Sequence, residues 1–177
     1  MGSVNEKVSY TLQEVQEKLK EPQHRLIHLC EKGVVIPDFE DAQGRGTMRR
    51  FSERNLFEFA LALELRRFTL PVAYLVPIIK VLRAFETYAA KQIEVFSLPK
   101  SLQNKPSVKL NLIITDGEHL FFTLKHKGET RYIGGLDLES VQRNKQPLSH
   151  AKVSLEDPTF SFTSRFEVDL NKIAQAL

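Results

Sequence analysis

The first regular pattern of apolar residues predicts a short helix that begins at Thr11. Thr11–Glu14 has the form Thr-x-x-Glu, in which the two side chains satisfy free backbone N–H groups at a helix start. Val15 and Leu19 then recur on one face of the helix. Glu21-Pro22 interrupts this pattern, because proline disfavours helical backbone in the residue before it.

A second helix is predicted from Pro22 to Lys32, and Gly33 ends it. Two short helices around a tight turn are typical of a helix-turn-helix. Val34–Pro37 then has extended character, residues 38–47 are rich in turn-forming residues, and Met48–Phe51 can form a return strand. The segment after the second helix is therefore expected to form a two-stranded wing.

Longer apolar patterns follow the wing. Ser52 is a good N-cap for a third helix, and Thr69 with Pro71 predicts a short further one. From Pro77, spacings of four and three predict a long helix that reaches Phe96, with a coiled-coil seam for pairing with a second copy of the chain. The seam residues are Ile78, Leu82, Phe85, Ala89, Gln92 and Phe96. The same stripe could instead pack on the chain's own C-terminal part.

The apolar period changes to two in the last third of the chain. Strands are predicted over 108–115 and 118–125, and over 130–138, with two tight turns between them. Further strand candidates are 151–155 and 160–168. Aromatic residues in this region are expected to fill a core rather than a ligand site.

The elements together predict an α+β protein with two modules. A winged helix-turn-helix is expected over 1–76, and a dimerisation helix over 77–97. Residues 98–107 mix Pro, Ser, Asn and Lys, which indicates a linker. Residues 108–177 then form a β-rich effector or interaction domain.

Composition places the chain among ordinary folded proteins. It has 177 residues, of which 42% are apolar and 27% charged. The single cysteine, Cys30, excludes an internal disulfide, and no stretch approaches the roughly 18 to 20 apolar residues that span a bilayer. A cytoplasmic protein without a membrane partner is therefore expected.

Positive charge is concentrated in the middle of the chain. The formal net charge is only +3, but between Ala42 and Arg83 there are eight basic residues and three acidic ones. This excess indicates either a solvated helix surface or a surface that binds phosphates.

Few residue patterns point to catalysis or to a metal. His24 and His28 are four apart on the second predicted helix, a spacing that could bind a metal, but Cys30 points about half a turn away. Two exposed polar residues are the favoured interpretation, and neither metal nor cofactor is expected. Phosphate-binding loops, nucleophile elbows and zinc-ligand spacings are absent from the sequence, so an enzyme is not expected.

Several segments together resemble the DNA-binding domain of MerR-type transcription regulators over about residues 9 to 97. The segments are YTLQEVQEKLK, PQHRLIHLCEKGVVIP, TMRRFS and NLFEFALALELRRFTLPVAYLVPIIKVL. The most specific pieces are Glu31–Gly33, Arg49–Ser52 and Arg66–Leu70. The chain departs from the family at His28–Cys30, where an Arg and two Tyr are common, and at Met48, where a Tyr is usual.

The resemblance implies a sequence-specific transcription regulator that binds a pseudo-palindromic promoter element as a homodimer. RNA polymerase is then a candidate partner, and the C-terminal module would bind an effector of unknown identity. The alternative is a regulator-derived module that binds another protein and has weak or lost DNA binding.

The second predicted helix and the wing supply the expected DNA contacts. Gln, Arg and His side chains on an exposed helix face suit base edges in the major groove, and wing arginines suit phosphates. The expected DNA-binding residues are Thr11, Gln23, His24, Arg25, His28, Lys32, Arg45, Arg49 and Arg50.

Overall fold

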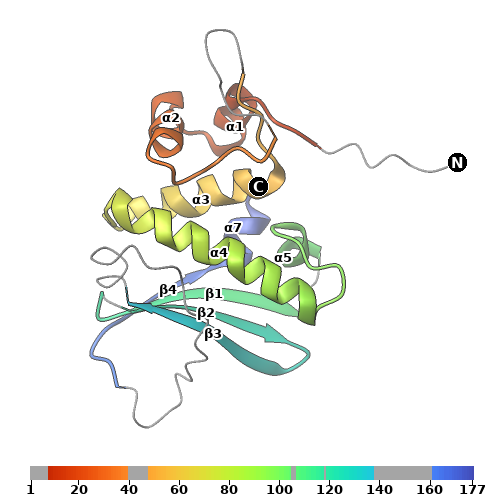
Figure 1. Ribbon diagram of the computed structural model, residues 1–177, viewed down its shortest axis with the longest axis vertical. Helices are drawn as coiled ribbons and strands as arrows, with labels where there is room; N and C mark the ends of the chain where they lie inside the picture. The colour runs from red at the N-terminus through yellow and green to blue at the C-terminus, as the bar shows by residue number, and fades with distance from the viewer. Residues whose placement is uncertain (1–7, 40–47, 105–106, 118, 138–160) are drawn as a thin grey trace, which may run out of the picture. The chain divides into compact units, whose positions relative to one another are not determined.

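The structure, a computed structural model, describes residues 8–39, 48–104, 107–117, 119–137 and 161–177, and of residues 130–137 only the backbone. Helices and one antiparallel sheet make up these ranges, which confirms the α+β class (Figure 1). The chain divides into two compact units, Met1–Val72 with Leu177, and Ala73–Ala176.

The N-terminal unit begins with the two predicted short helices. Helix α1 spans Leu12–Leu19, and Thr11 caps it in the predicted capping box with Glu14. Helix α2 spans Gln23–Glu31, and Pro22 is its N-cap. Gly33 follows with φ of 68°, the left-handed conformation that favours glycine and ends the helix.

The predicted wing strand over Val34–Pro37 is wrong. The backbone N–H of Val34 donates to the carbonyl of Leu29 at 2.9 Å, so this stretch closes the end of α2 instead of forming a strand. Phe51, on the predicted return strand, pairs with Tyr10 through two backbone hydrogen bonds of 2.8 and 2.9 Å. The predicted tip, with Arg45, lies outside the described residues.

Helix α3 spans Glu53–Arg67, and Ser52 caps it as predicted. Its apolar side supplies much of the N-terminal core: Phe59 is fully buried and contacts Phe51 edge to face, with ring centroids 5.3 Å apart. The side chain of Thr69 donates to the carbonyl of Phe68 rather than capping the next helix.

Helix α4 spans Val72–Gln92, five residues earlier at its start than the predicted Pro77 and four earlier at its end than Phe96. Pro77 lies inside the helix, where it removes one backbone hydrogen bond. Leu75 precedes it by less than one turn and is buried with Ile78, so the buried face of the helix continues through the proline.

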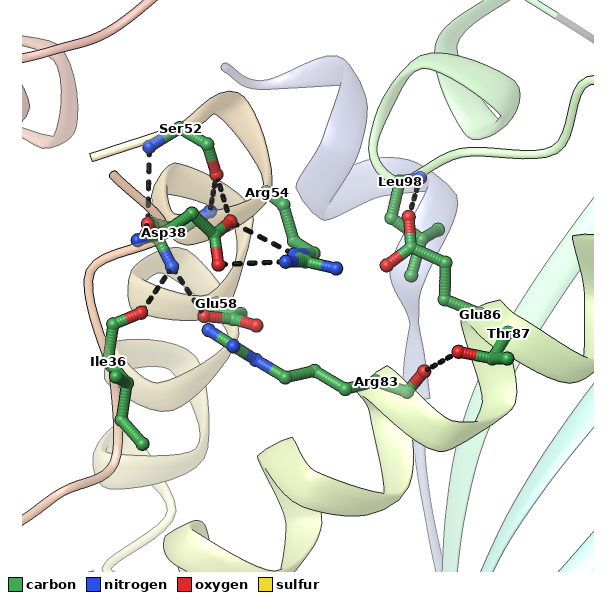
Figure 2. A network of polar contacts seen from close by, with 10 residues as sticks. Ile36, Asp38, Ser52, Arg54, Glu58, Arg83, Glu86, Thr87 and Leu98 are labelled. Carbon is green, nitrogen blue, oxygen red and sulfur yellow. Dashed lines mark hydrogen bonds and ion pairs between the residues drawn. The ribbon is translucent and has the colours of Figure 1, made fainter. Parts of the chain in front are cut away.

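The predicted linker over 98–107 is also wrong. It contains the short helix α5, Lys100–Asn104, and Leu98, Ser101 and Leu102 are buried. The backbone N–H of Leu98 donates to the Glu86 carboxylate on α4 at 2.8 Å (Figure 2). Because these contacts join the segment to α4, the unit boundary falls instead between Val72 and Ala73.

The C-terminal unit contains a four-stranded antiparallel sheet in the order β3-β2-β1-β4. Strand β1 spans Val108–Thr115, β2 spans His119–His126, β3 spans Glu129–Asp137 and β4 spans Arg165–Asp169. The first two hairpins are as predicted, and Lys127 and Gly128 both take positive φ in the tight second turn. Of the two further strand candidates, 151–155 lies outside the described residues.

The predicted dimerisation seam is buried within the single chain. Phe85 of α4 stacks on Phe122 of β2, with ring centroids 5.8 Å apart, and meets Phe96 edge to face at 6.1 Å. Ile78, Leu82 and Ala89 are buried as well, while Gln92 is exposed. The seam spacing is the same for a helix that covers a sheet, and in the structure the apolar stripe packs within the chain, which is the alternative given above.

A short C-terminal helix, α7, spans Leu170–Gln175 and is capped by Asp169. The amide side chain of Asn171 bonds to the first residues of β1, which β4 does not pair with. It accepts from the Leu110 N–H at 2.9 Å and donates to the Val108 carbonyl at 2.8 Å. Within the part of the chain that the structure describes, none of the helices combines the length and apolar character needed to cross a membrane.

Candidate nucleic-acid interface

Helix α2 has one polar side that faces solvent. Leu26 and Leu29 are buried, and Ile27 and Cys30 are half-buried. The α2 residues predicted to bind DNA, and Lys32 at its C-cap, are exposed as predicted: Gln23, His24, Arg25, His28 and Lys32. The acidic Glu31 at the end of the helix is exposed as well. The helix therefore anchors itself by two leucines and presents a continuous polar surface.

The exposed side of α2 borders a hollow of about 200 Å³, which we call the α2–α3 hollow. Leu29, Leu63 and Val72 give it an apolar part. Its polar lining residues are His24, Arg25, His28, Arg66 and Arg67. The hollow thus joins three predicted DNA-binding residues to two arginines at the end of α3.

Arg66 and Arg67 were missing from the residues predicted to bind DNA. They belong to the basic cluster between Ala42 and Arg83, but that cluster gives no indication of which of its members reach α2. Only the packing of α3 against α2 brings the arginines to the helix.

The three arginines of the hollow have different partners. Arg25 Nη1 lies 2.8 Å from a Glu21 carboxylate oxygen, and Arg67 Nη1 lies 2.9 Å from a Glu64 oxygen. Arg66 donates instead to the backbone carbonyl of Leu70 at 2.8 Å. Since a carbonyl carries no net charge, this bond does not neutralise Arg66 in the way that the ion pairs neutralise Arg25 and Arg67.

Thr11 has a capping role in the structure. Its hydroxyl accepts from the Glu14 N–H at 3.3 Å, and its own N–H donates to the Glu14 carboxylate at 2.7 Å. This backbone bond, then the Thr11 hydroxyl, and to a smaller extent the charge of Arg50 lower the pKa of Glu14. The Thr11 side chain is therefore engaged within α1.

The wing arginines are not part of the hollow. Arg49 and Arg50 are half-buried beside Phe51, and neither lines the α2–α3 hollow. Arg45 lies outside the described residues. The structure thus brings together the α2 residues of the predicted site and leaves the described wing arginines apart from them.

A polar network joins Ile36 and Asp38, which follow α2, to the start of α3 (Figure 2). Asn55 is fully buried, and its side chain accepts from the N–H groups of Asp38 and Ser52 at 2.8 and 3.2 Å. It also donates to the Ile36 carbonyl at 2.9 Å and to the Glu58 carboxylate at 3.0 Å.

Arg54 belongs to the same network and not to an exposed basic surface. Its guanidinium makes two bonds to the Asp38 carboxylate, from Nε at 3.0 Å and from Nη2 at 2.8 Å. The Ser52 hydroxyl donates to the same carboxylate. One of the eight basic residues of the central cluster therefore has a structural role.

Metal ligands do not converge in the ranges that the structure describes: no three His, Cys, Asp or Glu residues are grouped so that they could hold an ion. His24 and His28 both line the α2–α3 hollow, where their neighbours are arginines. Cationic neighbours disfavour a bound cation and favour an anion.

The C-terminal unit has a hollow of its own, of about 280 Å³, at the end of α4 and the β2–β3 hairpin. Its lining combines His126 and Lys127 with Glu129 and the amide of Gln92. Because basic, acidic and neutral polar side chains line it together, this hollow does not indicate which class of effector would bind there.

Compared with models of protein families, the chain has no match, and a comparison with curated proteins likewise found none.

Proposed function

We propose that the protein is a sequence-specific DNA-binding transcription regulator that places helix α2 in the major groove. The observation that carries the proposal is the exposed polar side of α2, which continues into the cationic α2–α3 hollow. The resemblance of residues 9–97 to MerR-type regulators supports the same function.

The side chains of α2 suit contacts with base edges. A glutamine amide such as that of Gln23 can bond to adenine N6 and N7, and an arginine such as Arg25 can bond to guanine O6 and N7. Both lie in the first turn of the helix, the part that a recognition helix presents to base edges. Two buried leucines fix the orientation of this helix on the core.

The arginines at the end of α3 suit the phosphates that flank the groove. Arg66 and Arg67 are exposed, and a guanidinium can bind a phosphate with two parallel hydrogen bonds. Each phosphate that they neutralise would release counterions, so the affinity is expected to depend on salt.

We further propose that two copies bind one pseudo-palindromic site. A single helix-turn-helix contacts too few base pairs to be selective in a genome, and two copies about 34 to 36 Å apart are the usual solution. Because the apolar seam of α4 is buried, the copies must meet through other surfaces or through the DNA itself.

Selection of bound sequences from a random DNA pool tests the proposal. We expect one enriched sequence with two related half-sites, bound by two copies of the chain as measured by native mass spectrometry. A pool without an enriched sequence would contradict the proposal and favour the alternative, a module that binds another protein.

A salt titration on the enriched sequence tests the phosphate contacts. Arg66→Ala should lower the slope of log Kd against log salt by about one unit for each phosphate that Arg66 neutralises, for all sequences alike. Lys125→Ala, at an exposed lysine of β2, is the matched control and should leave the slope unchanged.

A further inference from the structure

Arg25 forms an ion pair with an acidic residue of the preceding turn. Its Nη1 donates to the Glu21 carboxylate at 2.8 Å. The two partners differ in accessibility: 59% of the Arg25 side chain is exposed, against 13% of the Glu21 side chain. The carboxylate therefore lies against the protein, and the guanidinium extends from it toward solvent.

The backbone around Glu21 is itself constrained. Lys20, before it, takes the left-handed conformation that ends α1, and Pro22, after it, has the fixed φ of proline. The Glu21 N–H also donates to the Gln16 carbonyl at 3.4 Å. The turn thus sets the position of the carboxylate before any ligand is bound.

Among the residues that the structure describes, the guanidinium of Arg25 bonds to Glu21 through one nitrogen, and its other donors can serve a ligand. Arginine has five N–H donors in a planar fork, and the contact with Glu21 uses a donor on Nη1 alone. An arginine that is already oriented loses less side-chain freedom when it binds. Guanine is the base that offers two acceptors, O6 and N7, to such a fork.

We infer that Glu21 is a positioning residue that orients Arg25 toward a guanine in the major groove. The inference rests on the proposed function. It adds that the base contacted by Arg25 is a guanine, and that Glu21 controls specificity without touching a base itself. A carboxylate near DNA also repels phosphates, so Glu21 lowers the affinity for all sequences while it increases discrimination.

The experiment uses the full chain and the DNA sequence that the wild type enriches. Replacing the contacted guanine by 7-deazaguanine removes the N7 acceptor, and it should weaken wild-type binding by roughly tenfold. Glu21→Gln should bind non-cognate DNA as tightly as the wild type or more tightly, and should lose most of this sensitivity to 7-deazaguanine.

Two further variants separate positioning from charge. Glu64→Gln removes the carboxylate that pairs with Arg67 in the same hollow, and should keep the full sensitivity to 7-deazaguanine. Arg25→Lys keeps the charge but lacks the fork, so it should lose the sensitivity while the salt slope stays the same. Circular dichroism of each variant checks that it is folded.

The outcomes distinguish this inference from the proposed function. If the wild type enriches a sequence but Glu21→Gln keeps the wild-type sensitivity to 7-deazaguanine, the positioning role is refuted and DNA binding stands. If Glu21→Gln and Glu64→Gln lose the sensitivity equally, general charge and not positioning is responsible. If the wild type enriches no sequence, the proposed function fails, and the inference fails with it.

Discussion

Asn55 joins the described residues that follow α2 to the start of α3. Its amide satisfies two backbone N–H groups, one backbone carbonyl and the Glu58 carboxylate, all around a fully buried side chain. Asn55→Ala should lower the free energy of unfolding by about 2 to 4 kcal/mol, because it leaves these groups without their partner.

Urea denaturation measures this change. Asn104→Ala, at an exposed asparagine of α5, is the control and should cost less than about 0.5 kcal/mol. Equal stability of the two variants would show that the network does not stabilise the fold.

We expect the stability of the C-terminal unit to depend on pH through Asp116. Its Oδ1 accepts from the N–H groups of Ser164 and Thr163 at 2.8 and 2.9 Å. The Ser164 bond is the largest cause that lowers the pKa of Asp116 below its ordinary value of 3.8. A lowered pKa in the folded state contributes stability above the unfolded pKa, and this contribution is lost as the pH falls through the folded pKa.

We therefore expect Asp116→Asn to be less stable than the wild type at pH 7. The difference should shrink as the pH falls below about 4, where the wild-type carboxylate becomes protonated. Urea denaturation from pH 7 to pH 2.5 gives both curves. A difference that stays constant over this range would contradict the role of the carboxylate charge.

The caps of the elements could be predicted from sequence because they are local. Thr11, Ser52 and Gly33 act within three or four residues of their own position, and the structure confirms each one. The β2–β3 turn is equally local, since Lys127-Gly128 specifies its conformation.

Which helix or strand each element packs against could not be predicted in the same way. The stripe on α4 has a spacing that suits both a second helix and a sheet, and the choice depends on Phe122, which is distant in sequence. For the same reason the candidate site was found only in part: α2 carries its own exposed residues, but Arg66 reaches the α2–α3 hollow through packing of α3 that no local pattern encodes. The Glu21–Arg25 ion pair, by contrast, has the local i,i+4 spacing and could have been predicted from the sequence.

Helix α4 is expected to be a structural element of the C-terminal unit. Phe85→Ala removes a ring that contacts both Phe96 and Phe122, and should lower the free energy of unfolding by about 3 to 5 kcal/mol. Thr87→Ala, at an exposed position of the same helix, is the control. If Phe85→Ala kept the wild-type stability but turned a dimer into a monomer in solution, the coiled-coil interpretation would be supported instead.

The whole molecule divides at a different place from the one its sequence predicts. A fragment of residues 98–177 corresponds to the predicted β module but lacks α4, so Phe122 would lose the ring that covers it. We expect this fragment to be unfolded and the fragment of residues 72–177 to fold. Dispersion of amide signals in NMR spectra compares the two, and a folded 98–177 fragment would show that α4 is dispensable.

The side chain of Asn171 takes the place of a neighbouring strand along part of β1. Strand β4 pairs with β1 only from Asn111 to Thr115, which would leave the backbone groups of Val108 and Leu110 free to add a strand from another chain. The Asn171 amide occupies both groups in the way that a neighbouring backbone would. One side chain therefore satisfies the two β1 groups that β4 does not pair, and we expect Asn171→Ala to open this part of β1 to a strand from another molecule.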